Sequence, residues 1–152
     1  MPSTSSTSSK RTYLDYPHLR HVQDFADHAR SLGALLILLY GSVARGEFRE
    51  DSDADVFVLT AAPIAWRQVY QRTHGIVQPV VKTVDEMLTQ MHSGEPFFLE
   101  MIEDGVPLHD SDGWHRRLLA EVEQAKTKWG LTRTTFGWQW AKWEQSPEET
   151  HR

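Results

Sequence analysis

Two aspartates, Asp53 and Asp55, have the residue types and the spacing best suited to chemistry in this sequence. They lie two positions apart in the segment 53–60, where β-prone apolar residues predict a strand. Side chains two positions apart on a strand point to the same face, so we expect the two carboxylates side by side. Such carboxylates repel each other unless a cation lies between them, and Mg²⁺ prefers a few carboxylates together with water and phosphate oxygens. The pair therefore predicts a Mg²⁺ site.

A second group of residues fits a phosphate ligand. Gly41 and Ser42 directly follow the apolar run 34–40, which predicts a buried strand. A glycine at a strand end lets a ligand approach the backbone, and Ser42 offers a hydroxyl and an amide at the start of a helical turn. Arg45 adds a fixed positive charge one turn later. An ion pair between Arg45 and either Asp53 or Glu47 is the alternative, and the sequence leaves both roles open.

The elements that must position these motifs are an alternation of helices and strands. Thr83 followed by Glu86 is typical of a helix cap, and Pro79 marks its strand as broken or as an edge strand. The order of elements predicts an α/β (α+β) domain with one small sheet and helices packed on it. We expect strands over 34–40, 53–60 and 76–83 and a short extended piece over 106–108. We expect helices over 19–29, 84–91, 95–102 and 114–129, a helix or extended turn over 63–72 and a helical turn over 43–46.

Length and composition limit the class of protein. The 152 residues suit a single core, and the net charge of −5 argues against a general nucleic-acid-binding protein. The absence of cysteine excludes disulfides, thiolate chemistry and cysteine-based zinc sites. The longest apolar run, 34–39, is far short of the roughly 20 residues that span a bilayer, and no secretory signal precedes it. We therefore expect a cytoplasmic protein without a membrane partner.

The spacing of the two motifs resembles the DNA polymerase β-like nucleotidyltransferase superfamily. Gly41-Ser42, ten residues and then Asp53-x-Asp55 match its signature, and the longer text GSVARG…SDADVFV is similar to its minimal nucleotidyltransferase (MNT) branch, often the antitoxin partner of a HEPN-domain protein. The resemblance covers about residues 19–108. It implies a small mixed palm-like sheet, a nucleoside triphosphate that is usually ATP, and Mg²⁺. It also implies transfer of a nucleoside monophosphate to an acceptor hydroxyl, which in the HEPN-paired branch can be a toxin tyrosine.

The resemblance assigns roles to particular residues. Asp53 and Asp55 are the expected catalytic and metal-binding residues. The family usually has a third carboxylate on the third strand, where this sequence has Gln78 followed by Pro79. A glutamine amide cannot accept a proton as a general base. The residues expected to bind the nucleotide are Gly41, Ser42, Arg45 and Ser52.

Three functions therefore compete. The first is an active nucleotidyltransferase that modifies a partner protein. The second is a nucleotide-binding module that has lost catalysis through Gln78 and acts by binding its partner. The third is a small-molecule adenylyltransferase, but such enzymes usually carry an additional helical domain for which this chain has little room. Homo-oligomerisation stays open.

The chain is expected to divide into three regions. Residues 1–12 are rich in serine and threonine and suggest a disordered tail. Residues 13–130 form the nucleotidyltransferase domain. Residues 131–152 form a tryptophan-rich extension, with Trp138, Trp140 and Trp143, that is either a packing seam or a partner surface.

Overall fold

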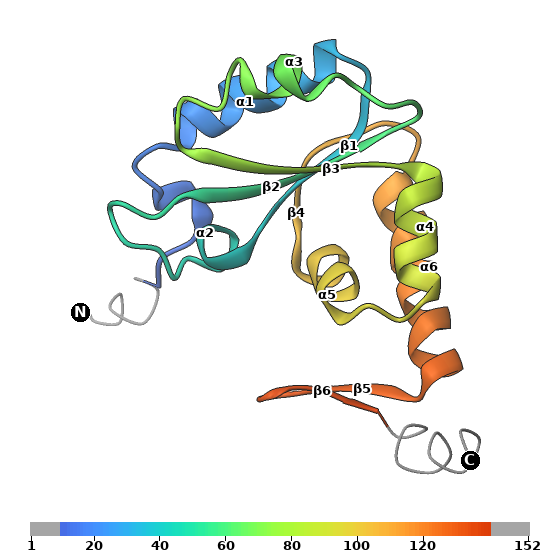
Figure 1. The fold of residues 1–152 in the computed structure, drawn as a ribbon. Coiled ribbons are helices and arrows are strands. Elements are labelled where there is room, and N and C mark those ends of the chain that lie inside the picture. Colours follow the sequence, from blue (N-terminus) through green and yellow to red (C-terminus); the bar gives the residue numbers. More distant parts are fainter. Residues whose placement is uncertain (1–9, 141–152) are drawn as a thin grey trace.

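The computed structural model describes residues 10–140, and a mixed four-stranded sheet lies at the centre of that part of the chain (Figure 1). Strand β1 (Ala34–Tyr40) pairs antiparallel with β2 (Ala54–Thr60) on one side and with β4 (Val106–Asp110) on the other. Strand β3 (Val77–Thr83) pairs parallel with β2, so the strand order is β3-β2-β1-β4. The predicted fold class is confirmed, and Pro79 lies on an edge strand, where a missing backbone donor is tolerated.

The middle of each central strand, 34–39 in β1 and 56–59 in β2, is apolar because both faces of the sheet are covered there. Ile37 and Leu39 belong to one core cluster, whereas Leu36 and Leu38 belong to the other, and all four are fully buried. Alternate residues of a strand point to opposite faces, so a run without polar residues is what a doubly covered strand requires.

Helix α1 (Leu19–Ser31) covers the first face, together with the short helix α3 (Trp66–Tyr70) in the crossover from β2 to β3 (Figure 1). Val22 and Phe25 of α1 are fully buried against the sheet. The sequence predicts a helix or an extended turn over 63–72, and the helix occupies only Trp66–Tyr70 of that segment.

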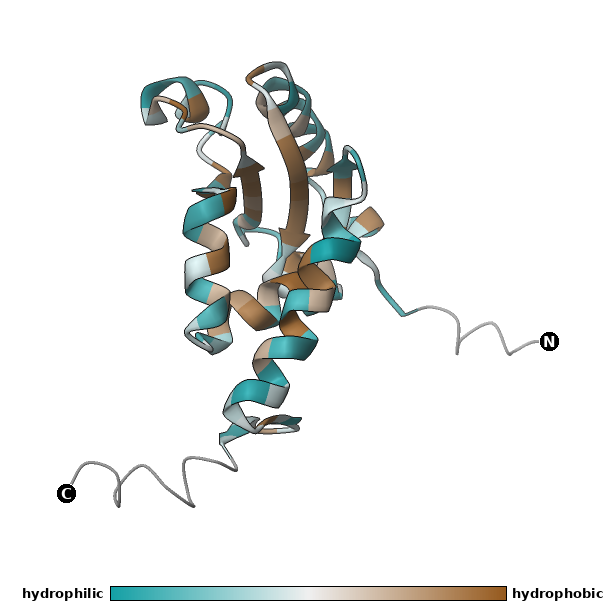
Figure 2. Cartoon of the chain, turned by 90° about the vertical axis from the view of Figure 1, so that its right-hand side faces the viewer, coloured by the Kyte–Doolittle hydropathy of each residue, from teal (hydrophilic) through white to brown (hydrophobic). Residues whose placement is uncertain are grey.

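Three helices cover the second face: α4 (Val84–His92), α5 (Pro96–Asp104) and α6 (Trp114–Trp129). The predicted cap of α4 is confirmed, because Thr83 Oγ1 accepts from the amide of Glu86 and the Glu86 carboxylate accepts from the amide of Thr83. Figure 2 shows the apolar strands in brown between helices that are banded brown and teal, as amphipathic helices are. No helix of residues 10–140 is long and apolar enough to cross a membrane.

A C-terminal hairpin is the main element that the sequence did not predict. Strand β5 (Leu131–Thr134) pairs antiparallel with β6 (Gly137–Trp140), through a two-residue turn at Thr135 and Phe136. This turn lacks the Asn-Gly or Asp-Gly pair that usually signals a hairpin. Trp138 and Trp140 pack against the core cluster of the second face, whereas Trp143 lies outside the described residues.

The N-terminal end of the described chain contacts the domain. The guanidinium of Arg11 donates to the carbonyl of Phe48 and lies over its ring, and Thr12 caps the 3₁₀-helix η2 (Tyr13–Asp15). These contacts involve the last residues of the predicted tail, whose residues 1–9 lie outside the described part. The division into a domain over 13–130 and an extension over 131–152 stays a prediction.

Candidate functional site

The turn at the end of β1 brings the two sequence motifs together. Helix α2 (Gly41–Arg45) begins directly after Tyr40, two residues earlier than predicted. Gly41 has φ +78°, and a Cβ at this position would lie 2.5 Å from Oδ2 of Asp55. The sequence suggested that Gly41 leaves room for a ligand, and the structure shows that the Asp55 carboxylate takes part of that room.

Asp53 and Asp55 lie on the same face of the sheet. Asp55 pairs in register with Tyr40 on β1 and with Gln78 on β3. Phe57, two residues beyond Asp55, packs in the core under α4, α5 and α6. Because alternate residues of a strand share a face, Asp55 also lies on the face that α5 covers. Nε2 of Gln78 donates a hydrogen bond of 3.3 Å to Oδ2 of Asp53. Tyr40 at the end of β1, Asp55 at the start of β2 and Gln78 at the start of β3 therefore lie side by side at one edge and on one face of the sheet.

Burial and the two carboxylates together set the electrostatics of this end of the sheet. Burial raises the pKa of Asp55, the charge of Asp53 raises it further, and Arg45 opposes both effects. Burial and the charge of Asp55 raise the pKa of Tyr40 to about 12. Both shifts show that this end of the sheet disfavours additional negative charge.

The donor set at this end fits a divalent cation. Two carboxylates on one face repel each other, and a cation between them would reverse the rise in the pKa of Asp55. The described residues contain no group of three or more acidic, histidine or cysteine side chains that could hold a metal. Two carboxylates would leave the other positions to water and phosphate oxygens, which is how Mg²⁺ usually binds.

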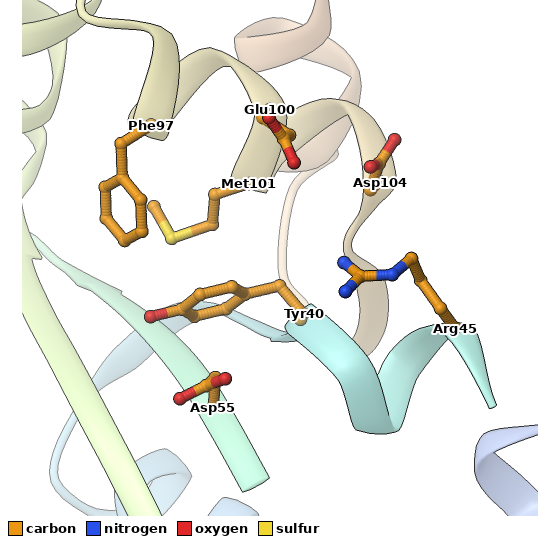
Figure 3. Close-up of a pocket in the computed structure, with 8 residues that line it drawn as sticks. Tyr40, Arg45, Asp55, Phe97, Glu100, Met101 and Asp104 are labelled. Carbon is orange, nitrogen blue, oxygen red and sulfur yellow. The ribbon is translucent and has the colours of Figure 1, made fainter. Parts of the chain in front are cut away.

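A cavity of about 230 Å³ opens beside Asp55, between the sheet and α5. Figure 3 shows Tyr40 and Asp55 on the sheet side, with Phe97 and Met101 reaching toward them from α5. Phe97 is exposed at the rim, and its ring meets the ring of Tyr40 edge-on at 6.0 Å. The cavity is lined by Tyr40, Gly41, Arg45, Asp55, Phe97, Glu100, Met101 and Asp104.

The remaining predicted nucleotide-binding residues occupy different places. Nε of Arg45 lies 2.9 Å from Oε1 of Glu47, so the ion pair is present, and Arg45 also lines the cavity. Ser42 is half-buried in α2 beside Gly41. Oγ of Ser52 accepts from the amide of Arg49 at 2.8 Å, which closes the turn before β2. Ser42, Ser52 and Asp53 are outside the cavity lining.

Sequence reasoning missed the α5 side of the site. Phe97, Glu100, Met101 and Asp104 follow the spacing i, i+3, i+4, i+7, which places them on one helical face. The apolar members of this pattern predicted a packing helix, and only the position of α5 over the end of β1 makes the same face a cavity wall.

The sequence of residues 26–113 matches the family described as Polymerase beta, Nucleotidyltransferase. This span is more than half of the chain. The chain belongs to this family. No curated protein matches the sequence of this chain.

Two solved structures resemble this chain. A crystal structure of a toxin–antitoxin with AMP-PNP is 15% identical, covers 70% of this chain and 87% of the other, and has a TM-score of 0.52. A candidate nucleotidyltransferase from Sulfolobus solfataricus is 16% identical, covers 72% of this chain and 90% of the other, and has a TM-score of 0.43. At this identity the first likeness shows a shared fold.

Proposed function

We propose that this chain binds a nucleoside triphosphate, with ATP expected, and Mg²⁺, and transfers a nucleoside monophosphate to a hydroxyl of a partner protein. The contact between Gly41 and the carboxylate of Asp55 carries the proposal, because it joins the two motifs in one polar site. Membership of the nucleotidyltransferase family supports the reaction class. The fold relative is a toxin–antitoxin with AMP-PNP, which supports an ATP-like substrate and a partner protein. The resemblance of the two motifs to the MNT branch is the basis for the proposed antitoxin role, with a HEPN-type partner in the cytoplasm.

The roles of the residues follow from their chemistry. Gly41, Ser42 and Arg45 hold the phosphates at the end of β1, with Ser52 shaping the approach to β2, and Asp53 and Asp55 hold Mg²⁺. The metal, when bound, neutralises charge on the triphosphate and on the leaving group. The acceptor hydroxyl oxygen forms a bond to the α-phosphorus and its proton passes to water, while the bond from the α-phosphorus to the bridging oxygen breaks and pyrophosphate leaves. The chain contributes mainly positioning and electrostatic stabilisation.

A second candidate function is a nucleotide-binding module without catalysis. The observation that favours it is the position of Gln78, which is paired with Asp55 in the sheet and donates to Asp53. A neutral amide at this position supplies no general base for the acceptor hydroxyl, so nucleotidyl transfer would be lost while nucleotide binding is kept. Such a protein would act by binding its partner.

Calorimetry with ATP tests the proposal, with and without Mg²⁺. We expect Mg²⁺-dependent binding that is lost in the Asp53→Asn/Asp55→Asn variant. Asp51→Asn is a matched control, because it removes a carboxylate from the exposed loop before β2. ATP binding that is absent, or that survives in the double variant, would contradict the proposed site.

Transfer of label from α-labelled ATP to a HEPN-type protein from the same genome distinguishes the two candidates. Labelled partner in the presence of the wild-type chain, and none with the double variant, supports the enzyme. Tight Mg²⁺-dependent ATP binding with no labelled partner supports the binding module.

A further inference from the structure

The α5 wall of the cavity is held from outside the region that matches the family. The family match ends at residue 113, and the β5–β6 hairpin follows α6 and lies beneath α5 (Figure 1). Arg133 on β5 contacts Asp104 through both terminal nitrogens, at 2.9 Å and 2.7 Å. The same side chain lies 3.0 Å from Glu103 and 3.3 Å from Glu100.

The second strand of the hairpin reinforces this contact. Nε1 of Trp138 on β6 donates to Oε1 of Glu100 at 3.3 Å, while Oε2 of Glu100 faces Arg133. The guanidinium of Arg133 lies over the ring of Trp138, 5.5 Å from its centroid. Both oxygens of Glu100 therefore face donors on the hairpin, and the planar fork of Arg133 fixes Asp104 in the bidentate geometry that arginine favours.

Glu100 and Asp104 matter to the site because both line the cavity that also contains Asp55. Arg45 is the cationic side chain in that lining. Without Arg133, three carboxylates would face one arginine, and the cavity would repel a polyphosphate. The side chain of Arg133 is 30% exposed, so solvent screens its charge less than that of a freely exposed arginine.

We propose that Arg133 is a positioning residue of the nucleotide site, which fixes Glu100 and Asp104 in the cavity wall and neutralises them so that a polyphosphate binds beside Asp55. This inference rests on the proposed nucleotide binding. The β5–β6 hairpin lies beyond the residues that match the family, so a segment outside the family match helps to hold the site in place.

The test measures the Kd of ATP with Mg²⁺ for the full chain. Arg133→Gln is expected to raise the Kd roughly tenfold at low ionic strength, because two carboxylates lose their counter-charge. The effect should shrink at about 0.5 M salt, where the Debye length falls to a few ångströms. The Arg133→Gln/Asp104→Asn variant should recover most of the affinity, since it removes a charge that Arg133 no longer neutralises.

Lys126→Gln provides the matched control. Lys126 has the same charge and is paired with Glu103 and Glu123, neither of which lines the cavity. Its loss should change the Kd by less than about twofold. Thermal unfolding of each variant reports separately on the stability of the hairpin.

Several results would overturn the inference. An unchanged Kd in folded Arg133→Gln, an equal loss in Lys126→Gln, or a lack of recovery in the folded double variant would each assign Arg133 a purely structural role. If Arg133→Gln does not fold, the double variant decides, and it should bind within roughly threefold of the wild type. If the wild-type chain itself binds no nucleotide, the proposed function fails and this inference falls with it.

Discussion

The carboxylate of Asp55 lies against the backbone of Gly41, with Oδ2 only 2.5 Å from where a Cβ of residue 41 would stand. The contact arises because Tyr40 and Asp55 pair in register on the antiparallel strands β1 and β2. Gly41 also has φ +78°, which disfavours any side chain. Glycine is therefore required at this position for two independent reasons.

Gly41→Ala should destabilise the fold and abolish Mg²⁺-dependent ATP binding. The left-handed backbone costs an alanine about 1–2 kcal/mol, and the clash with Asp55 adds to that cost by displacing the carboxylate. Gly75→Ala is the matched control, because Gly75 has φ +67° and nothing within 4 Å of a Cβ. Urea unfolding and calorimetry on both variants measure the difference. Equal destabilisation, with ATP binding retained by both, would show that the contact with Asp55 is unimportant.

Asp55→Asn should stabilise the metal-free protein at neutral pH. Burial and Asp53 raise the pKa of Asp55 above its ordinary value of 3.8, and the attraction of Arg45 is the smallest of the effects. A carboxyl with a raised pKa in the folded state binds protons more tightly there, so its contribution to stability is lost as pH rises through that pKa. The advantage of the variant should appear above that pKa and vanish below pH 3.8.

Chemical unfolding at a series of pH values, without Mg²⁺, checks this prediction. Addition of Mg²⁺ and ATP should reverse the order, because a ligand that binds only the folded wild type stabilises it by mass action. Asp51→Asn controls for the loss of a carboxylate outside the site. A variant that is less stable than the wild type at neutral pH would argue against repulsion between Asp53 and Asp55.

Gln78→Asp should raise the rate of nucleotidyl transfer. Residue 78 is paired with Asp55 and contacts Asp53, so an aspartate here adds a third carboxylate to the same face. A general base contributes on the order of 10²-fold or more to proton transfer in an enzyme. The initial rate of label transfer from α-labelled ATP to the HEPN-type partner is the measurement. Gln78→Asn is the control, since it has the shape of aspartate without the charge, and equal rates for the two variants would count against a missing base.

In the Tyr40→Phe variant the free energy of unfolding should fall less steeply with rising pH above pH 10.0 than it does in the wild type. Burial and Asp55 raise the pKa of Tyr40 from 10.0 to about 12. The folded state therefore holds the phenol proton more tightly than the unfolded state, and this contribution is present below pH 10.0 and lost as pH rises toward about 12. Unfolding free energies of both proteins over this range measure the effect, and parallel curves would show that Tyr40 is not in the environment described.

The candidate catalytic strand was accessible to sequence reasoning because its signals are local. Side chains two positions apart on a strand point to the same face, so the placement of Asp53 and Asp55 on one face follows from the strand alone. The capping box at Thr83 and Glu86 is equally local, and so is the strand position of Gln78. The meeting of Gly41 with Asp55 also required the pairing of β1 with β2, which the register of the two strands shows.

The α5 wall and its support were not accessible in this way. Arg133 and Asp104 are 29 residues apart and Trp138 and Glu100 are 38 apart, with α6 between them. No periodicity spans such distances, because helical and strand patterns report only on neighbours within a few turns. The hairpin itself lacked the usual turn residues, so its tryptophans suggested only a surface or a seam.

The sequence by itself determined the polar end of β2, the turn after β1, the buried sheet and the neutral side chain at residue 78, because each depends on residues close together in the chain. Only the tertiary structure decided that Asp55 fills the space beside Gly41, that α5 forms a wall with Glu100 and Asp104, and that Arg133 balances their charge. The physical reason is that packing and electrostatic balance act through space, between elements whose mutual position no local pattern encodes.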